Sequence, residues 1–220
     1  MSIELETLDG IIFDMDGVIF DTERIGLKSW QIVADKYNIQ NITATAQKCI
    51  GRNTTDSFQI IKADYGDSVD IPKLYKESKI AFAKLIEKNG LPLKAGAKEL
   101  LQFLKAQNVK VGLASSTNYD TVVQQLTQAE LLDYFQSIVG GDMVTHSKPE
   151  PEIYLLACRK LGVAPEKTIA VEDSYNGIKS AYNAKMMPVL VPDLIEPNDE
   201  MLSMSYKKYN SLLEFMSDCV

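Results

Sequence analysis

Two carboxylates, Asp14 and Asp16, stand two residues apart between the apolar run 11–13 and Gly17. On an extended strand, residues i and i+2 point to the same side, so both carboxylates can reach one point in space. Two acids at the end of a buried strand can hold a divalent cation and still leave one oxygen free to attack an electrophile. The alternative interpretation is an exposed turn after an edge strand, because Asp and Gly are common in turns.

The composition narrows the class of protein. With 220 residues, 45% of them hydrophobic and 24% charged, the chain is long enough for one domain with a sizeable core, or for a core domain that carries a small insertion. The formal net charge of -7 and the lack of a basic stripe in the sequence argue against a protein that binds nucleic acid.

Cysteine usage and hydropathy bear on the compartment. Cys49, Cys158 and Cys219 are widely spaced and odd in number, which is typical of reduced thiols and not of a disulfide framework. The first residues are acidic and include no apolar export signal, and no apolar run approaches the ~18 residues that cross a bilayer. We therefore expect a cytoplasmic protein that does not bind membranes.

The segment 19–88 is predicted to be helical almost throughout. A first helix begins after Asp21, and Trp30 and Tyr37 have the spacing of residues that pack between helices. Further helices are expected over 44–50, 54–65 and 73–88, separated by glycine and proline. This segment therefore has the composition of an all-helical insertion.

From residue 91 onward, apolar strands alternate with amphipathic helices. This order predicts a doubly wound parallel sheet with helices on both faces, an α/β core made of 1–18 and 89–220 into which the helical cap 19–88 is inserted. Such sheets bind ligands at the carboxyl ends of their strands. The expected strands are 109–114, 137–140, 168–171 and 188–191, and the expected helices are 96–107, 121–130, 151–161, 174–184 and 210–216.

Polar residues stand at or just beyond the predicted strand ends: Ser115 and Ser116, Lys148, and Glu172 with Asp173. Hydroxyls, one cation and further carboxylates beside Asp14 are the groups that phosphoryl transfer requires. Each also has a plainer interpretation: the serines and the acidic pair could serve the starts of helices, and Lys148 could be a solvated loop residue. His146, the only histidine, is interpreted as a loop residue.

Four segments, in this order, carry a resemblance to a known family. They are Asp14-Met-Asp-Gly-Val, Leu113-Ala-Ser-Ser-Thr, Ser147-Lys-Pro-Glu-Pro-Glu-Ile-Tyr and Val171-Glu-Asp-Ser-Tyr-Asn-Gly-Ile. The chain resembles the haloacid dehalogenase-like (HAD) hydrolase superfamily, in the subgroup that includes β-phosphoglucomutase and many small phosphomonoester phosphatases. The resemblance covers essentially the whole chain, is weakest in the helical insertion, and implies a Rossmann-like core with a cap.

The resemblance also implies a role for each motif residue. Asp14 would attack the substrate phosphorus and form an aspartyl-phosphate. Asp16 would protonate the leaving oxygen and later deprotonate the attacking water, which requires Asp16 to be neutral when substrate arrives. Ser115 and Ser116 would bind phosphoryl oxygens, and Lys148 would pair with phosphate and with Asp14.

The implied cofactor is Mg²⁺. It would be held by Asp14, the main-chain carbonyl of Asp16 and Asp173, with Glu172 either a further ligand or a neighbour of the ligands. An all-oxygen site of this kind suits magnesium. In the cap, the turn residues Gly51, Arg52 and Asn53 are expected to contact the leaving group.

The second acid separates the possible activities. Dehalogenases and phosphonate hydrolases that resemble this chain lack an aspartate at the position of Asp16, so a phosphatase acting on a small phosphomonoester such as a sugar phosphate is favoured. The alternative is an isomerase of the β-phosphoglucomutase type. Such mutases carry a cap histidine where this chain has Gly26 and a cap arginine where it has Thr54, although Arg52 is close.

Three further expectations follow. A non-catalytic protein that binds a small phosphorylated metabolite is a third possibility, but all the motif residues are present. A monomer is expected because no long apolar stripe remains unassigned. Lys185 stands where relatives often have glycine, and a left-handed backbone there would cost about 1 kcal/mol.

Overall fold

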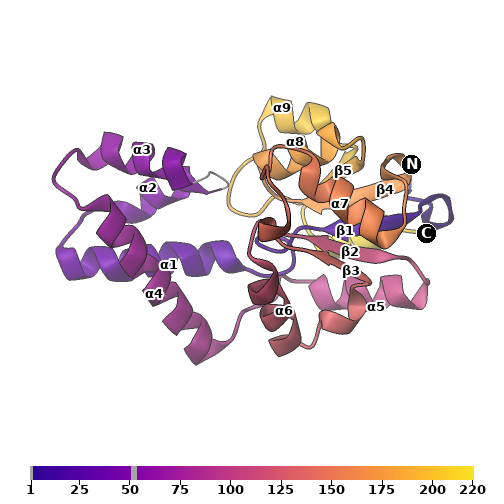
Figure 1. The fold of residues 1–220 in the computed structure, drawn as a ribbon, viewed down its shortest axis with the longest axis horizontal. Helices are drawn as coiled ribbons and strands as arrows, with labels where there is room; N and C mark the ends of the chain where they lie inside the picture. Colours follow the sequence, from indigo (N-terminus) through magenta and orange to yellow (C-terminus); the bar gives the residue numbers. More distant parts are fainter. Residues whose placement is uncertain (1, 51–53) are drawn as a thin grey trace. The chain divides into compact units, whose positions relative to one another are not determined.

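A computed structural model describes residues 2–50 and 54–220. The chain forms two compact units: the core unit, Met1–Phe20 with Leu93–Val220, and the cap unit, Asp21–Pro92 (Figure 1). The insertion was expected to begin at residue 19 and to end at residue 88. Ile19 and Phe20 lie in the core unit because the Ile19 carbonyl accepts a hydrogen bond from Lys94 N–H at 2.9 Å and Phe20 pairs with Leu93.

The core unit contains a six-stranded parallel sheet with the strand order β3-β2-β1-β4-β5-β6. In the register of its centre, Ile12 pairs with Gly112 on one side and with Ala170 on the other. This arrangement confirms the predicted doubly wound α/β fold. The strands are β1 Gly10–Phe13, β2 Val111–Ala114, β3 Ser137–Val139, β4 Thr168–Glu172, β5 Met187–Leu190 and β6 Lys207–Lys208.

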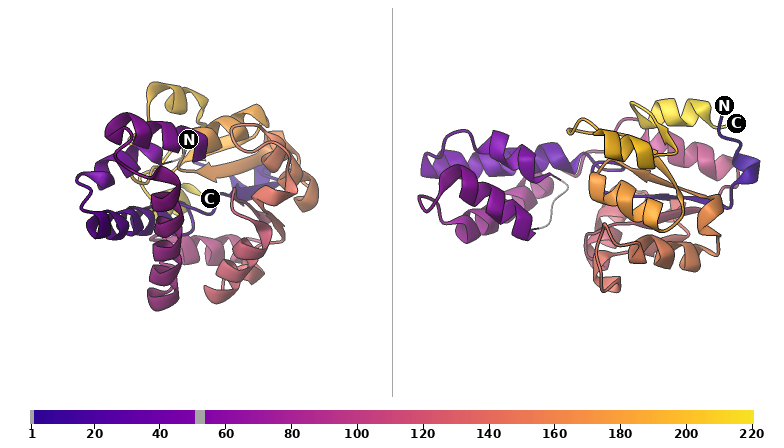
Figure 2. Two further views of the ribbon diagram at one scale, coloured as in Figure 1. Left: turned by 60° about the vertical axis from the view of Figure 1, so that its left-hand side comes forward. Right: turned by 90° about the horizontal axis from the view of Figure 1, so that it is seen from above.

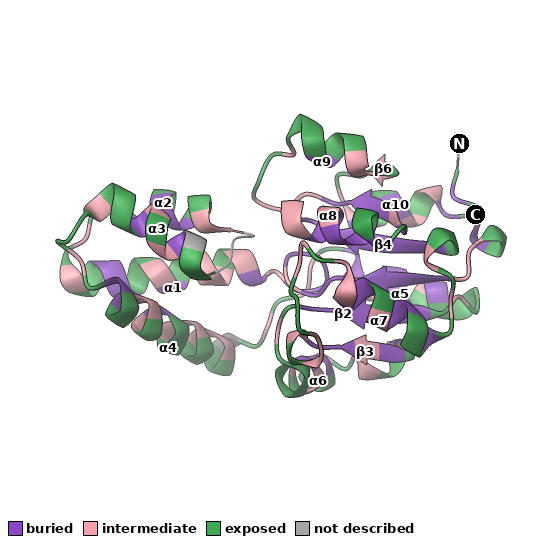
Figure 3. Cartoon of the chain, turned by 45° about the horizontal axis from the view of Figure 1, so that its top comes forward, coloured by how far each residue is buried: buried purple, intermediate pink, exposed green. Residues whose placement is uncertain are grey.

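Helices cover both faces of this sheet, and the central strands are buried (Figure 3). Helices α7 and α8 share a core cluster with Ile12, Ala114 and Ala170, whereas α5 and α10 contact each other on the opposite face (Figure 2, right). The helices are α5 Ala97–Ala106, α6 Tyr119–Gln128, α7 Glu152–Leu161, α8 Tyr175–Asn183, α9 Asp199–Met204 and α10 Leu212–Asp218, and the 3-10 turns are Leu5–Thr7, Leu132–Tyr134, Gly141–Met143 and Pro165–Lys167.

The local signals in the sequence explain most element ends. Ser174 caps α8, its hydroxyl accepting a hydrogen bond from Gly177 N–H at 3.1 Å. Helix α6 begins two residues before its predicted start because Asn118, whose side chain accepts from Asp120 N–H at 3.1 Å, is the cap. Lys185 has φ 64°, so a residue with a side chain occupies a left-handed position after α8, at a cost of about 1 kcal/mol.

The described residues of the cap unit form four helices: α1 Thr22–Tyr37, α2 Ile42–Cys49, α3 Thr54–Tyr65 and α4 Ile71–Asn89. Helix α1 packs against α2 and α4, and α2 packs against α3. Tyr37 ties α1 to α4, because its hydroxyl donates to the Glu77 carboxylate at 2.6 Å. In the part of the chain that the structure describes, no helix is both long and apolar enough to span a bilayer.

Candidate active site

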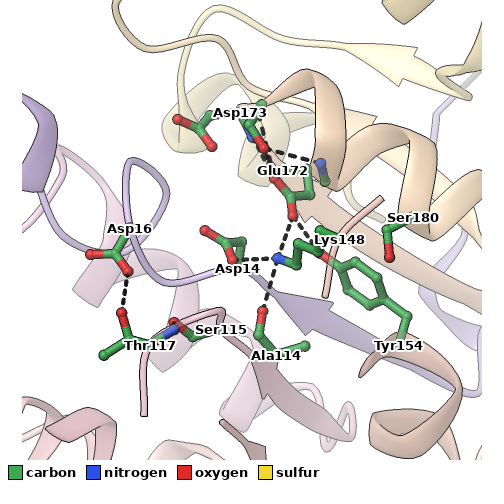
Figure 4. A network of polar contacts seen from close by, with 12 residues as sticks. Asp14, Asp16, Ala114, Ser115, Thr117, Lys148, Tyr154, Glu172, Asp173 and Ser180 are labelled. Atoms are coloured by element: carbon green, nitrogen blue, oxygen red, sulfur yellow. Dashed lines mark hydrogen bonds and ion pairs between the residues drawn. The ribbon is translucent and has the colours of Figure 1, made fainter. Parts of the chain in front are cut away.

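The carboxyl ends of three neighbouring strands bring the predicted site residues together (Figure 4). Asp14 directly follows β1, Ser115 directly follows β2, and Glu172 is the last residue of β4, with Asp173 next in the chain. Because β2, β1 and β4 are adjacent and parallel, these strand ends meet at one edge of the sheet. Lys148 reaches the same place from the loop that precedes α7.

The Lys148 ammonium lies at the centre of the site. It donates hydrogen bonds to Asp14 Oδ1 at 2.5 Å, to Glu172 Oε1 at 2.6 Å and to the main-chain carbonyl of Ala114 at 3.1 Å. Three contacts match the three N–H donors of an ammonium group. Lys148 is therefore a buried part of the site, with only 6% of its side chain exposed, and not the solvated loop residue of the alternative interpretation.

Burial and neighbouring charges shift the pKa values of Asp14 and Lys148 in opposite directions. Burial raises the pKa of Asp14 to about 8, against the attraction of the Lys148 ammonium, which lowers it. Burial alone would lower the pKa of Lys148, but the carboxylates of Asp14 and Glu172 outweigh it and raise that pKa above its ordinary value. The lysine stays charged, whereas Asp14 binds a proton readily unless further positive charge is present.

One oxygen from each of three buried carboxylates, Asp14, Glu172 and Asp173, lies within 4.8 Å of the others. The Lys148 ammonium contacts two of these carboxylates, Asp14 and Glu172, and a divalent cation among the three would add the positive charge that such a cluster attracts. Gly17 makes room for this cluster: its φ is 81°, and a Cβ there would lie 2.1 Å from Asp173 Oδ2. The donor set, all oxygen, fits a hard cation such as Mg²⁺.

Glu172 is held more firmly than the other two carboxylates. Its Oε1 accepts from Lys148 and also from the Tyr154 hydroxyl at 2.8 Å, and its Oε2 accepts from Asp173 N–H at 3.2 Å and from the Ser174 hydroxyl at 3.1 Å. Burial and the charge of Glu172 raise the pKa of Tyr154 well above its ordinary value, so this hydroxyl keeps its proton and donates. The carboxylate of Glu172 is completely buried.

Asp16 lies apart from this cluster. Its Oδ2 accepts a hydrogen bond from the Thr117 hydroxyl at 3.0 Å, and its side chain is half-buried (Figure 4). Thr117 belongs to the loop that follows β2, two residues after Ser115. The two acids of the first motif therefore have different surroundings: Asp14 faces a lysine, and Asp16 faces a neutral hydroxyl.

The two serines differ as well. Ser115 is fully buried, and its hydroxyl accepts a hydrogen bond from Thr117 N–H at 3.0 Å, so it shapes the loop after β2. Ser116 is exposed. Neither serine is the N-cap of α6, a role that Asn118 fills. Their binding of phosphoryl oxygens stays a prediction.

The sequence model of the haloacid dehalogenase-like hydrolases matches residues 11–191, a range that includes Asp14, Lys148 and Asp173. The chain belongs to this family. The predicted family membership and enzyme class, a hydrolase, are thereby confirmed.

Two of the relatives of this HAD-like hydrolase are named as phosphatases, and one similar solved structure is a β-phosphoglucomutase. A "Phosphorylated carbohydrates phosphatase" of Thermotoga maritima is 33% identical over 181 residues, which cover 80% of this chain and 82% of that protein. "Hexitol phosphatase B" of Escherichia coli is 34% identical over 138 residues, 63% of this chain and 62% of that protein. The crystal structure of a β-phosphoglucomutase from Clostridium difficile superimposes with a TM-score of 0.70 at 26% identity, over 93% of this chain and 92% of that one.

Three residues of the HAD-like site were given no role by the sequence: Thr117, Tyr154 and Gly177. Thr117 and Tyr154 are the last residues of the second and third motifs, so their place in the motifs was the available signal. Gly177 belongs to the fourth motif, and a Cβ there would lie 1.9 Å from the Glu172 side chain. Its small size thus allows α8 to approach β4 with Glu172 between them.

The cap unit of this HAD-like hydrolase has a hollow of its own, with a volume of about 250 Å³. Trp30 lines it and also packs between helices as expected, because its ring centroid lies 6.4 Å from that of Tyr75 in α4. Polar groups, among them Glu23, Ser57 and Lys79, share the lining with Gly26. The predicted contact residues Gly51, Arg52 and Asn53 lie outside the described residues.

His146 lies in the loop before α7, as interpreted from the sequence. Its ring Nδ1 is 3.1 Å from the Glu152 carboxylate, which also accepts hydrogen bonds from the main-chain N–H groups of Thr145 and His146. These two N–H groups lower the pKa of Glu152. The contact fixes the loop that carries Lys148 but adds no group to the site.

Proposed function

We propose that this protein is a Mg²⁺-dependent phosphatase that hydrolyses a small phosphomonoester, a sugar phosphate, through an aspartyl-phosphate on Asp14. The observation that carries the proposal is the Lys148 ammonium at 2.5 Å from Asp14 Oδ1, at the carboxyl ends of the strands. A carboxylate that is to attack a phosphoryl group must overcome the repulsion between two anions. The buried ammonium offsets this repulsion and orients the attacking oxygen.

The proposed reaction has two steps. In the first, a carboxylate oxygen of Asp14 bonds to phosphorus while the bond to the leaving oxygen breaks, and Asp16 gives that oxygen a proton. In the second, Asp16 takes a proton from water, whose oxygen displaces Asp14 from phosphorus and releases inorganic phosphate. Ser115, Ser116 and Lys148 bind the phosphoryl oxygens in both steps.

The proposed cofactor site uses Asp14, Asp173 and the main-chain carbonyl of Asp16. When bound, Mg²⁺ neutralises the charge that develops on the transferred oxygens. Glu172, which belongs to the same cluster of carboxylates, already accepts hydrogen bonds at both oxygens. Its role as a direct ligand stays a prediction.

The cap hollow supports a sugar as the leaving group. An aromatic face such as that of Trp30 packs against the C–H face of a sugar, while hydroxyl, carboxylate and ammonium groups bind its hydroxyls. The similarity to the Thermotoga maritima phosphatase agrees with this substrate class. Contacts from Gly51, Arg52 and Asn53, a monomeric state and a cytoplasmic location stay predictions.

A β-phosphoglucomutase-type isomerase is the second candidate, favoured by the structural likeness to the Clostridium difficile enzyme. Against it, Gly26 lines the cap hollow where the resembling mutases carry histidine, and a Cβ at Gly26 would meet nothing within 4 Å. The hollow therefore lacks a side chain at the position that a mutase uses.

The test measures inorganic phosphate released from a panel of phosphomonoesters, including β-glucose 1-phosphate and a hexitol phosphate, with Mg²⁺ and with a chelator. We expect metal-dependent release that favours some esters, and a loss of about 10³-fold or more in Asp14→Asn with the fold retained. Asp218→Asn, the same chemical change away from the site, is the matched control.

Two results would contradict the proposal. Glucose 6-phosphate formed with little free phosphate would establish the mutase instead. Turnover by Asp14→Asn equal to that of the wild type would remove the nucleophile from the mechanism, whatever the substrate.

A further inference from the structure

Tyr154 contacts both members of the Lys148–Glu172 pair. It is fully buried in the first turn of α7, its hydroxyl donates to Glu172 Oε1 at 2.8 Å, and its ring centroid lies 4.9 Å from the Lys148 ammonium (Figure 4). The oxygen that accepts from Tyr154 is the same one that accepts from Lys148. One side chain thus orients the carboxylate and covers the ammonium that it binds.

The remaining contacts of Glu172 show why the tyrosine hydroxyl matters. On the other side of the carboxylate, Oε2 is fixed by Asp173 N–H and by the Ser174 hydroxyl, and Gly177 leaves the room that the carboxylate fills. Among the described residues, the donors to the other oxygen, Oε1, are Lys148 and Tyr154. Glu172 is also close enough to Asp14 and Asp173 to turn toward a cation.

We propose that Tyr154 is a positioning residue that keeps Glu172 bound to Lys148, and thereby keeps the Lys148 ammonium directed at Asp14. The inference rests on the proposed function, since it assigns a task to a residue that does not touch substrate. Without the hydroxyl, Oε1 keeps the hydrogen bond from Lys148 and loses that from Tyr154, so this oxygen can turn toward a cation while Oε2 stays bound to Asp173 N–H and to Ser174. Lys148 would then lose the partner that fixes its position beside Asp14.

The test uses Tyr154→Phe, which removes the hydroxyl and keeps the ring. We expect kcat to fall by about 10- to 100-fold, the usual effect of removing a partner that orients a catalytic group, with little change in the substrate KM. We also expect several-fold tighter Mg²⁺ binding, measured by calorimetry without substrate, because the freed carboxylate is attracted by the cation.

Tyr209→Phe is the matched control. The Tyr209 hydroxyl donates to Asp218 Oδ2 at 2.5 Å, the oxygen that also accepts from Lys207 at 2.6 Å, so the same change is made in the same kind of cluster. We expect lower stability from this variant but unchanged kcat and Mg²⁺ binding. If Tyr154→Phe has the same outcome as Tyr209→Phe, Tyr154 has only a structural role and the inference is wrong.

A double variant tests whether Tyr154 affects activity through Glu172. If Tyr154 acts through Glu172, adding Tyr154→Phe to Glu172→Gln costs no further activity. A loss that persists in the Glu172→Gln background would contradict the inference. If the wild type releases phosphate from no ester, the proposed function fails, and the Mg²⁺ titrations of the two tyrosine variants then decide the inference alone.

Discussion

Two clusters of the core unit contain the same three groups but differ in exposure. In each, one carboxylate oxygen accepts from a lysine at 2.6 Å and from a tyrosine hydroxyl: Glu172 from Lys148 and Tyr154, and Asp218 from Lys207 and Tyr209. The side chains of Lys148 and Glu172 are 6% and 0% exposed, whereas those of Lys207 and Asp218 are 24% and 31% exposed.

In the buried cluster the lysine is shared by two carboxylates. The Lys148 ammonium pairs with Asp14 as well as with Glu172. Water screens the exposed cluster, so its ion pair is worth about 0–1 kcal/mol. The buried cluster has lost the solvation of its charges and depends on each partner that remains. The same contacts therefore contribute modestly to stability at the surface in the exposed cluster, whereas in the buried cluster they belong to the proposed active site.

The largest contrast is expected from removing each lysine. Lys148→Met leaves Asp14 and Glu172 facing each other without a counter-charge, so we expect a loss of about 3 kcal/mol in the free energy of unfolding and about 10³-fold in kcat/KM. Lys207→Met should cost less than about 1 kcal/mol and leave kcat/KM unchanged. Urea unfolding measures the stability and phosphate release measures kcat/KM. Equal losses of stability in the two variants would contradict the claim that the buried and exposed clusters differ.

A smaller effect is expected at Gly177, for which the exposed cluster has no counterpart. Alanine in a helix is favoured over glycine by about 1 kcal/mol, but a Cβ at this position would lie 1.9 Å from the Glu172 side chain. We expect the clash to prevail, with Gly177→Ala destabilised by about 1–3 kcal/mol and its kcat lowered about tenfold.

The control for this prediction removes the obstacle. In a Glu172→Ala background the alanine at 177 meets no carboxylate, so Gly177→Ala should become stabilising there. Unfolding measurements on the wild type, the two single variants and the double variant give the coupling free energy between positions 172 and 177. A substitution that costs as much in both backgrounds would show that the tight contact with Glu172 is not what requires glycine.

The sequence predicted the part of the site that strand ends determine. Asp14, Ser115 and Asp173 follow strands whose apolar runs are plain in the sequence, and parallel strands place such residues at one edge of the sheet. Lys148 was expected at or just beyond a strand end but lies on the loop before α7, so its motif was the signal that assigned it. Its contact with Ala114 depends on the folded path of that loop.

The roles of Tyr154 and Gly177 could not be predicted in the same way. Both depend on how α7 and α8 pack against the sheet and on the direction of one side chain, Glu172, which no periodicity encodes. Helix α9 and strand β6 were missed for a different reason. The segment 193–208 has no regular apolar pattern, and a strand of only two residues, Lys207–Lys208, gives no alternation to detect.

The smallest expected effects concern pH. The pKa of Asp14, which contacts the buried cluster, and the pKa of Asp218, which belongs to the exposed cluster, are shifted in opposite directions. Hydrogen bonds from Lys207 and Tyr209 lower the pKa of Asp218, so its contribution to stability is present above the ordinary pKa of 3.8 and is lost as the pH falls through the lowered value. Burial raises the pKa of Asp14 to about 8, so without cation its contribution is present below 3.8 and is lost as the pH rises toward about 8.

The proposed mechanism requires the ionised form of Asp14, so kcat/KM should rise with pH through the pKa of this group. A divalent cation favours the carboxylate and lowers that pKa. We therefore expect saturating Mg²⁺ to move the rising limb of the pH profile to lower pH by about one unit, compared with limiting Mg²⁺. On the acid side of the profile, this shift corresponds to about a tenfold difference in rate. Asp218→Asn should leave both limbs in place. A rising limb whose position does not change with the Mg²⁺ concentration would mean that Asp14 does not bind the cation, which would contradict the proposed cofactor site.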